Sequence, residues 1–439
     1  MKRALALLAL VGCGDDVQVF AEPRTIELSF PSAPNHKLDL LFMIDDSPGG
    51  PEIQAPLALS MTAVFDQLRA GGTLPDLHIG VLTSDLGTMG SLDPSQPGPP
   101  IGQVGNGGCV AAGDDARLQT FGTTVVDAFV IDEDDGAGGR RRNYQGELSD
   151  VVGMIFRGAG GGGCGFEQPL HAIRRALTQA SNQGFLRPDA HLGIVILTDE
   201  DDCSFRDPAL LRAETPDLGP LQSFRCSLEG LVCDEPMDQV GEKNACRARE
   251  DSRYVEGIAQ TRDALIATKA RPSDLSVISI VGLPSVAVEL RNPPGGGVGQ
   301  LALAHSCGTT GPQGLQVADP GVRIAELTKT FEGRGDVLSV CDAETPERFA
   351  GLARILKHPV GVICLDSTQL TDSNTERGIQ PACELTEIDG TTETRILDFE
   401  IVPDAAACPE TSDHLRLFVN RTSPASPTAY VRARCETPF

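Results

Sequence analysis

Residues 38–44 read LDLLFMI and are followed at once by Asp45, Asp46 and Ser47. An apolar run of this length is typical of a strand that is buried on both faces, as in a parallel sheet. Similar runs occur at 77–83 (LHIGVLT), 125–131, 191–197 (HLGIVIL), 275–281 (LSVISIV) and 336–340. The run at 38–44 therefore predicts the first strand of a sheet whose polar edge begins at Asp45.

Amphipathic segments alternate with these runs. Apolar side chains recur at helical spacing over 52–69, 146–157, 167–180, 254–270 and 346–357. Alternating strands and helices favour right-handed crossovers and a parallel sheet. We therefore expect an α/β fold over 36–358 with a doubly wound, mostly parallel sheet and long disulfide-bearing loops.

The pattern changes after residue 360, where short strand-like stretches are separated by Cys364, Cys383, Cys408 and Cys435. A small segment with so many cysteines predicts a β-rich domain at 360–439 that disulfides hold together. Residues 1–13 and 14–35 are expected to be a leader and a polar tether, with a short strand near 25–30.

Charge limits the partners. The chain has 439 residues, with 36 Lys or Arg and 61 Asp or Glu, so its formal charge is −25. Such a chain repels phosphates, which argues against nucleic acid as a partner. The one basic run, 140–142, follows the acidic stretch 132–135. No internal stretch is long and apolar enough to span a bilayer, so we expect membrane contact only through an anchor.

The first residues resemble an export signal. Lys2 and Arg3 precede a short apolar run at 4–11, which is the layout of a signal peptide. The run ends in Leu-Val-Gly-Cys13, which resembles a bacterial lipobox and makes Cys13 the candidate for lipidation. This predicts a lipoprotein of the bacterial cell envelope, facing the periplasm or the surface. An ordinary signal and a misassigned start codon are the alternatives.

The cysteine count agrees with export. Of 13 cysteines, 12 remain when Cys13 is set aside, which allows up to six disulfides in an oxidising compartment. The cysteines between 203 and 246 have irregular spacing without a CxxC pair, which disfavours zinc. We expect local pairing among them, and Cys109 as a partner of Cys164. Reduced thiols in a cytosolic protein are the alternative.

Two carboxylate clusters follow predicted strands, at 45–47 and at 199–202. Ligands of open α/β sheets sit beyond the carboxyl ends of strands, so we expect both clusters at one edge. Neighbouring carboxylates repel each other and need a cation, a proton or solvation. Asp and Ser oxygens suit Mg²⁺, Ca²⁺ or Mn²⁺.

The stretch LDLLFMIDDSPGG resembles the first strand and metal loop of a von Willebrand factor type A (vWA) domain. That family carries Asp-x-Ser-x-Ser after this strand, a Thr from a Gly-rich loop and an Asp after the fourth strand. Together they form a metal-ion-dependent adhesion site, and an acidic residue of the partner completes the coordination. The resemblance covers 36–358 in order of elements and implies a vWA-like, Rossmann-like fold.

The family's site residues carry over incompletely. Asp45 matches the first Asp, Ser47 the first Ser and Asp199 the fourth-strand Asp. The second Ser position is Gly49, and the Thr position falls in GGGGCGFEQPL, where Glu167 is the nearest oxygen donor. The resemblance implies a degenerate site for Mg²⁺ or Ca²⁺ made by Asp45, Ser47, Asp199 and, as a substitute, Glu167. A vestigial site without metal is the alternative.

Other polar features are given structural roles. The glycine run at 158–163 lacks the Gly-Lys-Ser/Thr ending of a phosphate loop, so we interpret it as a flexible loop. Asp46 and the acids at 200–202 are expected to be solvated, although one of them could act on the metal through water. His78 and His191 are expected at the beginnings of strands, away from the acidic edge.

These features favour a lipid-anchored envelope module for binding or adhesion that contacts a protein or a surface polymer and is not an enzyme. A metal-dependent hydrolase is one alternative, but it needs a His or Lys base near Asp45 and Asp199, and the sequence places none there. A structural scaffold whose acidic edge is merely solvated is the other.

Overall fold

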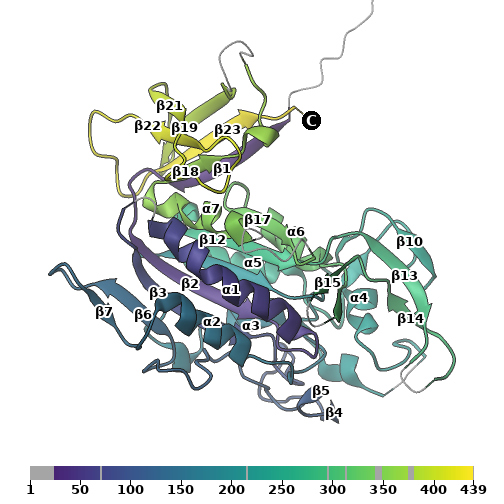
Figure 1. Cartoon of the computed structure of the whole chain (residues 1–439). Coiled ribbons are helices and arrows are strands. Elements are labelled where there is room, and N and C mark those ends of the chain that lie inside the picture. Colours follow the sequence, from purple (N-terminus) through teal and green to yellow (C-terminus); the bar gives the residue numbers. More distant parts are fainter. Residues whose placement is uncertain are drawn as a thin grey trace, which may run out of the picture.

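The structure is a computed structural model that describes residues 24–69, 72–213, 216–293, 296–311, 314–341, 349–373 and 380–438. The leader with Cys13 lies outside the described residues. A seven-stranded sheet with strand order β17-β12-β8-β2-β3-β6-β7 forms the centre (Figure 1). Its strands are β2 (Lys37–Ile44), β3 (Asp76–Thr83), β6 (Val130–Asp134), β7 (Arg140–Arg142), β8 (His191–Leu197), β12 (Leu275–Val281) and β17 (Gly335–Ser339).

Strand β2 is the middle of this sheet. It pairs in parallel with β3 from Lys37 to Ile44 and with β8 from Leu38 to Ile44, and every residue after Lys37 is buried. The apolar runs at 38–44, 77–83, 191–197 and 275–281 are strands, as predicted, because each is covered on both faces.

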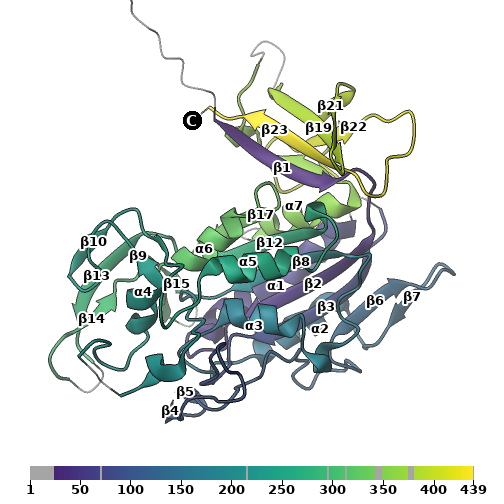
Figure 2. The ribbon, with the colours of Figure 1, turned by 180° about the vertical axis from the view of Figure 1, so that it is seen from behind.

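Helices cover both faces of the central sheet (Figures 1 and 2). One face packs against α1 (Gly50–Arg69), α2 (Leu148–Gly158) and α7 (Ala350–Leu356). The other packs against α3 (Pro169–Ala176), α5 (Ile258–Ile266) and α6 (Val322–Lys329). Short 3-10 helices occur at Ala180–Asn182, Pro208–Leu211, Pro272–Asp274, His358–Val360 and Ser367–Gln369.

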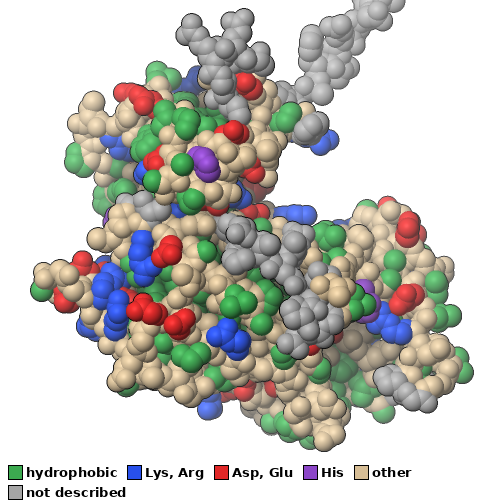
Figure 3. All heavy atoms as spheres, viewed as in Figure 1, with side chains coloured by type: hydrophobic (Ala, Val, Ile, Leu, Met, Phe, Trp, Pro, Cys, Tyr) green, Lys and Arg blue, Asp and Glu red, His purple; other side chains and the backbone are tan. Residues whose placement is uncertain are grey.

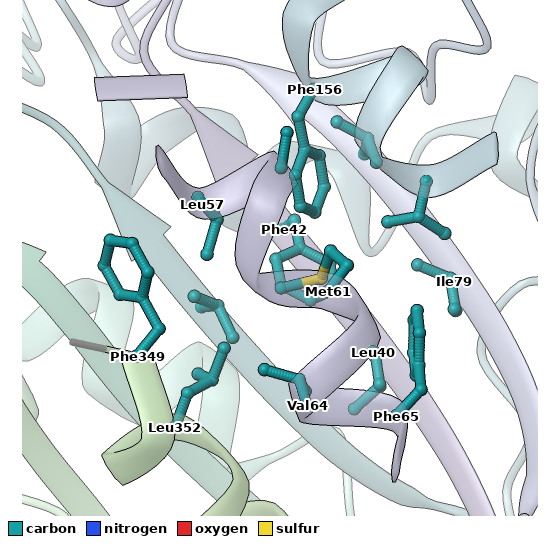
Figure 4. Close-up of a cluster of buried hydrophobic side chains, with 14 of the residues drawn as sticks. Leu40, Phe42, Leu57, Met61, Val64, Phe65, Ile79, Phe156, Phe349 and Leu352 are labelled. Atoms are coloured by element: carbon teal, nitrogen blue, oxygen red, sulfur yellow. The ribbon is translucent and has the colours of Figure 1, made fainter. Parts of the chain in front are cut away.

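The core between α1 and the sheet is built from the periodic residues of the predicted helix at 52–69. Leu57, Met61 and Val64 point from α1 toward the sheet (Figure 4), and each is at most 1% exposed. Phe42 of β2 and Phe156 of α2 meet with ring centroids 4.8 Å apart. Aromatic and aliphatic packing thus fixes α1 directly after the acidic loop at 45–49.

The predicted fold class is wrong for this chain. Strands account for 31% of the residues and helices for 22%, so the protein is β-rich rather than a doubly wound α/β domain. The central sheet is mixed, because β6 runs antiparallel to β3 and β7 antiparallel to β6. The described residues form six further sheets, all antiparallel, and several lie where long loops were expected.

Four of these small sheets lie in the insertions. They are β4 (Ile101–Gln103) with β5 (Asn106–Cys109), β9 (Leu231–Val232) with β11 (Arg247–Ala248), β15 (Cys307–Gly311) with β16 (Gly314–Ala318), and β10 (Gly241–Lys243) with β13 (Val286–Arg291) and β14 (Gln300–Leu303). The helix α4 (Phe224–Gly230) lies in the same lobe as β13 and β14 (Figure 1). Strands of two to six residues in Gly- and Pro-rich stretches are too short to show the alternation of apolar and polar residues from which strands are predicted.

Six disulfides hold these elements. They are Cys109–Cys164, Cys203–Cys226, Cys233–Cys246, Cys307–Cys341, Cys364–Cys408 and Cys383–Cys435. The expected number, the local pairing between 203 and 246, and the partner of Cys164 are confirmed. A loop closed by a disulfide loses less entropy on folding, which suits short strands with little core of their own.

The last strands form two sheets beside the central one (Figures 1 and 2). The first has the order β1-β23-β19-β20, and the second β18-β22-β21. Their bounds are β1 (Thr25–Pro31), β18 (Ile363–Leu365), β19 (Cys383–Asp389), β20 (Thr392–Ile396), β21 (Phe399–Pro403), β22 (Leu415–Val419) and β23 (Tyr430–Glu436). Because β1 pairs with β23 from Thr25 to Pro31, the early strand belongs to the sheet made by the C-terminal residues.

The basic run at 140–142 is neutralised inside its own hairpin. Strand β7 pairs with β6 so that Arg142 faces Asp132, and Arg140 and Arg141 form ion pairs with Asp132 and Glu133. In Figure 3, acidic and basic side chains lie next to one another over this hairpin. The run therefore presents no separate basic patch.

In the part of the chain that the structure describes, no helix has the length and apolar character that crossing a membrane requires.

The α1 packing leads to a stability prediction. Leu57 is fully buried, whereas Leu59, two residues along the same helix, is 71% exposed. We expect Leu57→Ala to lower the free energy of unfolding by about 2–5 kcal/mol, because it leaves a cavity against the sheet. Leu59→Ala should change it by less than about 0.5 kcal/mol. Urea unfolding of both variants measures this, and equal losses would contradict the packing described.

Candidate functional site at the carboxyl edge of β2 and β8

The parallel pairing of β2 with β8 brings the two predicted acidic clusters together. Ile44 is opposite Leu197, so the chain leaves both strands at the same edge. Asp45 is fully buried there, and its Oδ1 accepts a hydrogen bond from Ser47 N at 2.7 Å. Its Oδ2 accepts one from Thr198 Oγ1 at 2.6 Å, which ties the two strand ends to each other.

Asp199 occupies the space that a side chain at position 49 would fill. A Cβ placed on Gly49 would lie 2.3 Å from Asp199 Oδ2. The carboxyl groups of Asp199 and Asp45 lie within hydrogen-bonding reach of each other. Asp199 Oδ1 is buried and has no hydrogen-bond partner among the described residues. Where the vWA family has a Ser hydroxyl, Gly49 therefore leaves space, and the carboxylate of Asp199 occupies it.

The glycine run is held against the acidic loop rather than left loose. Gln54 Nε2 donates to Asp45 O at 2.7 Å and to Gly160 O at 2.6 Å. Gly163 N donates to Asp46 O at 2.7 Å, and a Cβ on Gly163 would lie 2.4 Å from Asp46 Cγ. The disulfide Cys109–Cys164 holds the next residue. The run is therefore held at Gly160 and Gly163, and the close packing of Gly163 on Asp46 requires glycine.

Glu167 lies at the same edge, beside Glu200. It is 1% exposed, and its Oε1 has no hydrogen-bond partner in the described part of the chain. Its backbone oxygen accepts from Cys203 N at 2.8 Å, which holds the segment before α3 against the loop after β8. The carboxyls of Glu167 and Glu200 are within hydrogen-bonding reach of each other.

Burial and mutual repulsion make this edge bind protons tightly. Burial raises the pKa of Asp45 and, together with neighbouring carboxylates, raises the pKa of Glu167 and Asp199 well above ordinary carboxyl values. Burial, followed by repulsion from Asp319 and Asp45, raises the pKa of Glu200 to about 8. Without a cation, protons must reduce the repulsion among these groups.

Asp46 points into a different group of acids. It is 5% exposed and accepts from Ser84 Oγ at 3.3 Å. Burial, and then repulsion from Asp85, Asp45 and Asp114, raises the pKa of Asp46 well above its ordinary value. The expectation that Asp46 is solvated is wrong, because the glycine run covers it.

Asp201 and Asp202 also differ from the expectation of solvated acids. Both oxygens of Asp201 accept from Arg323 N at 3.0 Å, at the start of α6. Asp202 is 1% exposed and forms an ion pair with the fully buried Arg323, with Oδ2 2.9 Å from Nη2. These contacts fix α6 to the loop after β8, while burial still raises the pKa of Asp201 to about 6.

Two further residues belong to this edge although the sequence did not single them out. Thr198 immediately precedes Asp199 and donates to Asp45, as described above. Asp319, which lies between β16 and α6, donates from its N to Asp199 O at 2.8 Å. Its Oδ1 lies 2.7 Å from His305 Nδ1. A single Asp in a loop carries no sequence signal that would have placed it here.

The histidines lie mostly elsewhere. His191 begins β8 and His78 lies near the start of β3, at the opposite edge, as expected. His171 is buried in α3, and burial lowers its pKa to about 3. Among the described residues, the one tight group of three metal-ligating types is Cys364, Cys408 and Glu410, but its cysteines form a disulfide. That group therefore offers no thiolate to a metal.

The oxygen donors at the edge fit a hard divalent cation in type and placement. Asp45, Ser47 and Asp199 supply carboxylate and hydroxyl oxygens at one point, and Asp199 Oδ1 is an orphaned acceptor. A cation would neutralise the repulsion that now raises their pKa values. Glu167 and Glu200 are additional carboxyl groups at the same edge, and both interact with Asp45. Each predicted site residue that is described is thus at this edge.

The raised pKa of Glu200 gives a pH prediction. Its ordinary value is 4.5 and its value in the folded protein is about 8. The stabilising contribution is therefore complete below pH 4.5 and is lost as the pH rises through about 8, because the folded protein holds the proton more tightly. In EDTA we expect the urea midpoint to fall across this window, and to fall less in Glu200→Gln.

Glu242→Gln is the matched control for this experiment, because Glu242 is exposed on β10. It should show the same decline as the wild type. A midpoint that rises with pH, or an equal decline in Glu200→Gln, would contradict the burial of this carboxyl.

Comparisons with known proteins give only distant likenesses. No family model and no curated protein matches the sequence. The structure is similar to the pilus adhesin SpaC from Lactobacillus rhamnosus GG, with 8% identity and a TM-score of 0.31 over 94% of this chain and 42% of that one. It is also similar to an adhesive tip pilin from Group B Streptococcus agalactiae, with 10% identity and a TM-score of 0.30 over 94% of this chain and 81% of that one.

The third likeness is to a human COPII-coat protein, with 10% identity and a TM-score of 0.29 over 97% of this chain and 44% of that one. The chain thus spans less than half the length of SpaC and of the coat protein. Two of these three proteins are adhesive pilus proteins. TM-scores at this level do not establish a shared fold, so function is argued from the acidic edge itself.

Proposed function

We propose that this protein is a binding module whose carboxyl edge holds Mg²⁺ or Ca²⁺ through Asp45, Ser47 and Asp199. One observation carries the proposal: two acidic strand ends, 45–47 and 199, meet at one point where carboxyl groups are buried together. A divalent cation supplies the positive charge that this arrangement lacks. The resemblance of these residues to the metal-ion-dependent adhesion site of the vWA family supports the same three ligands.

Asp45 and Asp199 would contribute to cation binding in different ways. Asp45 is oriented by Ser47 N and Thr198 Oγ1, so its carboxylate is fixed before any cation arrives. Asp199 lies over Gly49 with one oxygen unpaired. The cation would leave a coordination position for an acidic group of the partner, which we propose to be a protein or a surface polymer.

The proposed setting is the bacterial cell envelope, with the chain attached through a lipid on Cys13. The lipobox-like sequence at the start supports the anchor, and six disulfides support an oxidising compartment. A tethered binding module agrees with the acidic surface, which disfavours nucleic acid and anionic lipid as partners.

Cation binding is tested by thermal unfolding in Mg²⁺ or Ca²⁺ against EDTA. A ligand that binds only the folded state at 100 times its dissociation constant stabilises it by about 2.7 kcal/mol. We expect a concentration-dependent rise in Tm for the wild type, and loss of that rise in Asp45→Asn and Asp199→Asn. Both variants keep the shape of the side chain and remove its charge.

Asp66→Asn is the control, because Asp66 lies on the exposed side of α1 with a side chain 65% exposed. It should respond to the cation as the wild type does. A wild type whose Tm does not change with either cation, or variants that respond as it does, would overturn the proposal.

Gly49 provides a second test of the same site. Gly49→Ala adds a methyl group where Asp199 Oδ2 now lies, with the new Cβ 2.3 Å from that oxygen in the present geometry. We expect Asp199 to be displaced and the cation-induced rise in Tm to decrease by more than half. The control is Ala55→Gly on α1, which also changes a single methyl group. A glycine with a positive φ, such as Gly138, cannot serve because alanine would be strained there. An undiminished response in Gly49→Ala would show that Asp199 is not a ligand.

A further inference from the structure

A cavity of about 320 Å³ lies next to the acidic edge, between the loop after β8, the helix α4 and the strands β13 and β14. These elements form the lobe beside the central sheet in Figures 1 and 2. The disulfide Cys203–Cys226 joins two of its walls, and both cysteines line it. Neither Asp45, Ser47 nor Asp199 lines the cavity, so it is a site separate from the proposed cation site.

The charges around this cavity do not balance. Five carboxyl groups line it, but only two guanidinium groups do; the acids are Glu167, Glu200, Asp201, Asp202 and Asp319. Arg323 is fully buried and forms an ion pair with Asp202. Arg291 donates to Glu289 at 2.9 Å and to Leu303 O at 2.7 Å. Both arginines are therefore already engaged, and neither forms an ion pair with Glu167 or Glu200.

Glu167 and Glu200 both line the cavity, and their carboxyl groups lie within hydrogen-bonding reach of each other. Neither has an ion pair with a Lys, Arg or His among the described residues within 4.0 Å. Glu167 Oε1 is buried, on a side chain only 1% exposed, and it accepts no hydrogen bond from the described part of the chain. A buried carboxyl oxygen without a hydrogen-bond partner is costly, and a charged donor that enters the cavity would satisfy it.

The remaining walls suit a hydrocarbon chain. Leu221, Phe224 and Leu303 line the cavity, and Phe224 and Leu303 belong to one apolar cluster. Gln222 Nε2 is engaged by Leu301 O at 2.7 Å, which leaves the amide oxygen as an acceptor. The cavity thus combines apolar side chains with acceptors in its walls, as a lysine side chain combines a methylene stem with an ammonium group.

We propose that this cavity binds an alkylammonium group, presented as a lysine side chain by a partner protein, with Glu167 and Glu200 as its acceptors. The volume lies at the low end for ligand pockets, which suits one side chain rather than a large molecule. The lysine site does not require the divalent cation, because Asp45, Ser47 and Asp199 do not line the cavity.

The test uses the folded protein in EDTA and measures dissociation constants by ligand-observed saturation-transfer NMR. The probes are Nα-acetyl-lysine amide, Nα-acetyl-norleucine amide and cadaverine. Norleucine keeps the hydrocarbon stem without the ammonium group, so we expect it to bind at least about tenfold more weakly than the lysine amide. If Nα-acetyl-lysine amide binds at least as tightly as cadaverine, the result supports a protein side chain as the occupant.

Glu200→Gln and Glu167→Gln remove one acceptor charge each while keeping the side-chain shape. Each should weaken the lysine amide at least about tenfold, whereas Glu242→Gln, on the exposed strand β10, should not. Thermal unfolding confirms that each variant is folded. The proposal is overturned if norleucine amide binds as tightly as lysine amide, or if both folded variants bind like the wild type. Binding of cadaverine alone overturns the protein origin of the group.

The two proposals fail separately. A wild type that binds lysine amide in EDTA but shows no rise in Tm with Mg²⁺ or Ca²⁺ contradicts the cation site alone. A wild type whose Tm rises with Mg²⁺ or Ca²⁺ but that does not bind lysine amide in EDTA contradicts the lysine site alone.

Discussion

Electrostatic repulsion among buried carboxyl groups is the constraint on which this structure depends. Asp45 is fully buried and Glu167 is 1% exposed, and the half-buried Asp199 and Glu200 follow shortly after the end of β8. Asp45 raises the pKa of the other three, and Glu200 raises the pKa of Glu167 and Asp199, so the group is unfavourable when all its members are ionised. The parallel pairing of β2 with β8 nevertheless fixes it, because the hydrophobic core on both faces holds the strands in register.

Several local devices keep these acids in place. Hydrogen bonds from Ser47 N and Thr198 Oγ1 orient Asp45, and Gly49 and Gly163 leave room for the carboxylates of Asp199 and Asp46. The Arg323–Asp202 pair and the disulfide Cys203–Cys226 anchor the loop after β8. A chain that merely tolerated solvated acids would not need to bury and brace them. The arrangement favours cations, and the two proposed occupants, a divalent ion and an ammonium group, follow from that one property.

Sequence patterns predicted the parts of the structure that depend on long, continuous burial. The run at 38–44 predicted β2 and the acidic edge, because a strand covered on both faces leaves a plain apolar signature. The small antiparallel sheets escaped prediction since strands such as Leu231–Val232 are too short to show alternation. The fold class was wrong for this reason. Asp39 was also missed: it interrupts the apolar run, but Arg187 forms a 2.8 Å ion pair with it.

Within the site, proximity of Asp45, Ser47 and Asp199 could be predicted from where the strands end, and that of Glu167 only from the resemblance to the vWA family, whereas burial could not. Asp46 and Asp202 look like surface acids in the sequence, but a glycine run covers the first and Arg323 pairs with the second. Asp319 comes from a distant loop, and only the tertiary structure places its backbone N 2.8 Å from Asp199 O. Residues brought by such loops complete the cavity beside the edge.

The most direct measurement is a crystal structure of the protein grown with Mn²⁺, with an anomalous difference map at the manganese absorption edge. Our account requires a single strong peak at the carboxyl edge, within about 2.0–2.6 Å of oxygens of Asp45, Ser47 and Asp199. A map without a peak there, in crystals that show Mn²⁺ elsewhere or none at all, would contradict the claim that this edge is built to hold a divalent cation.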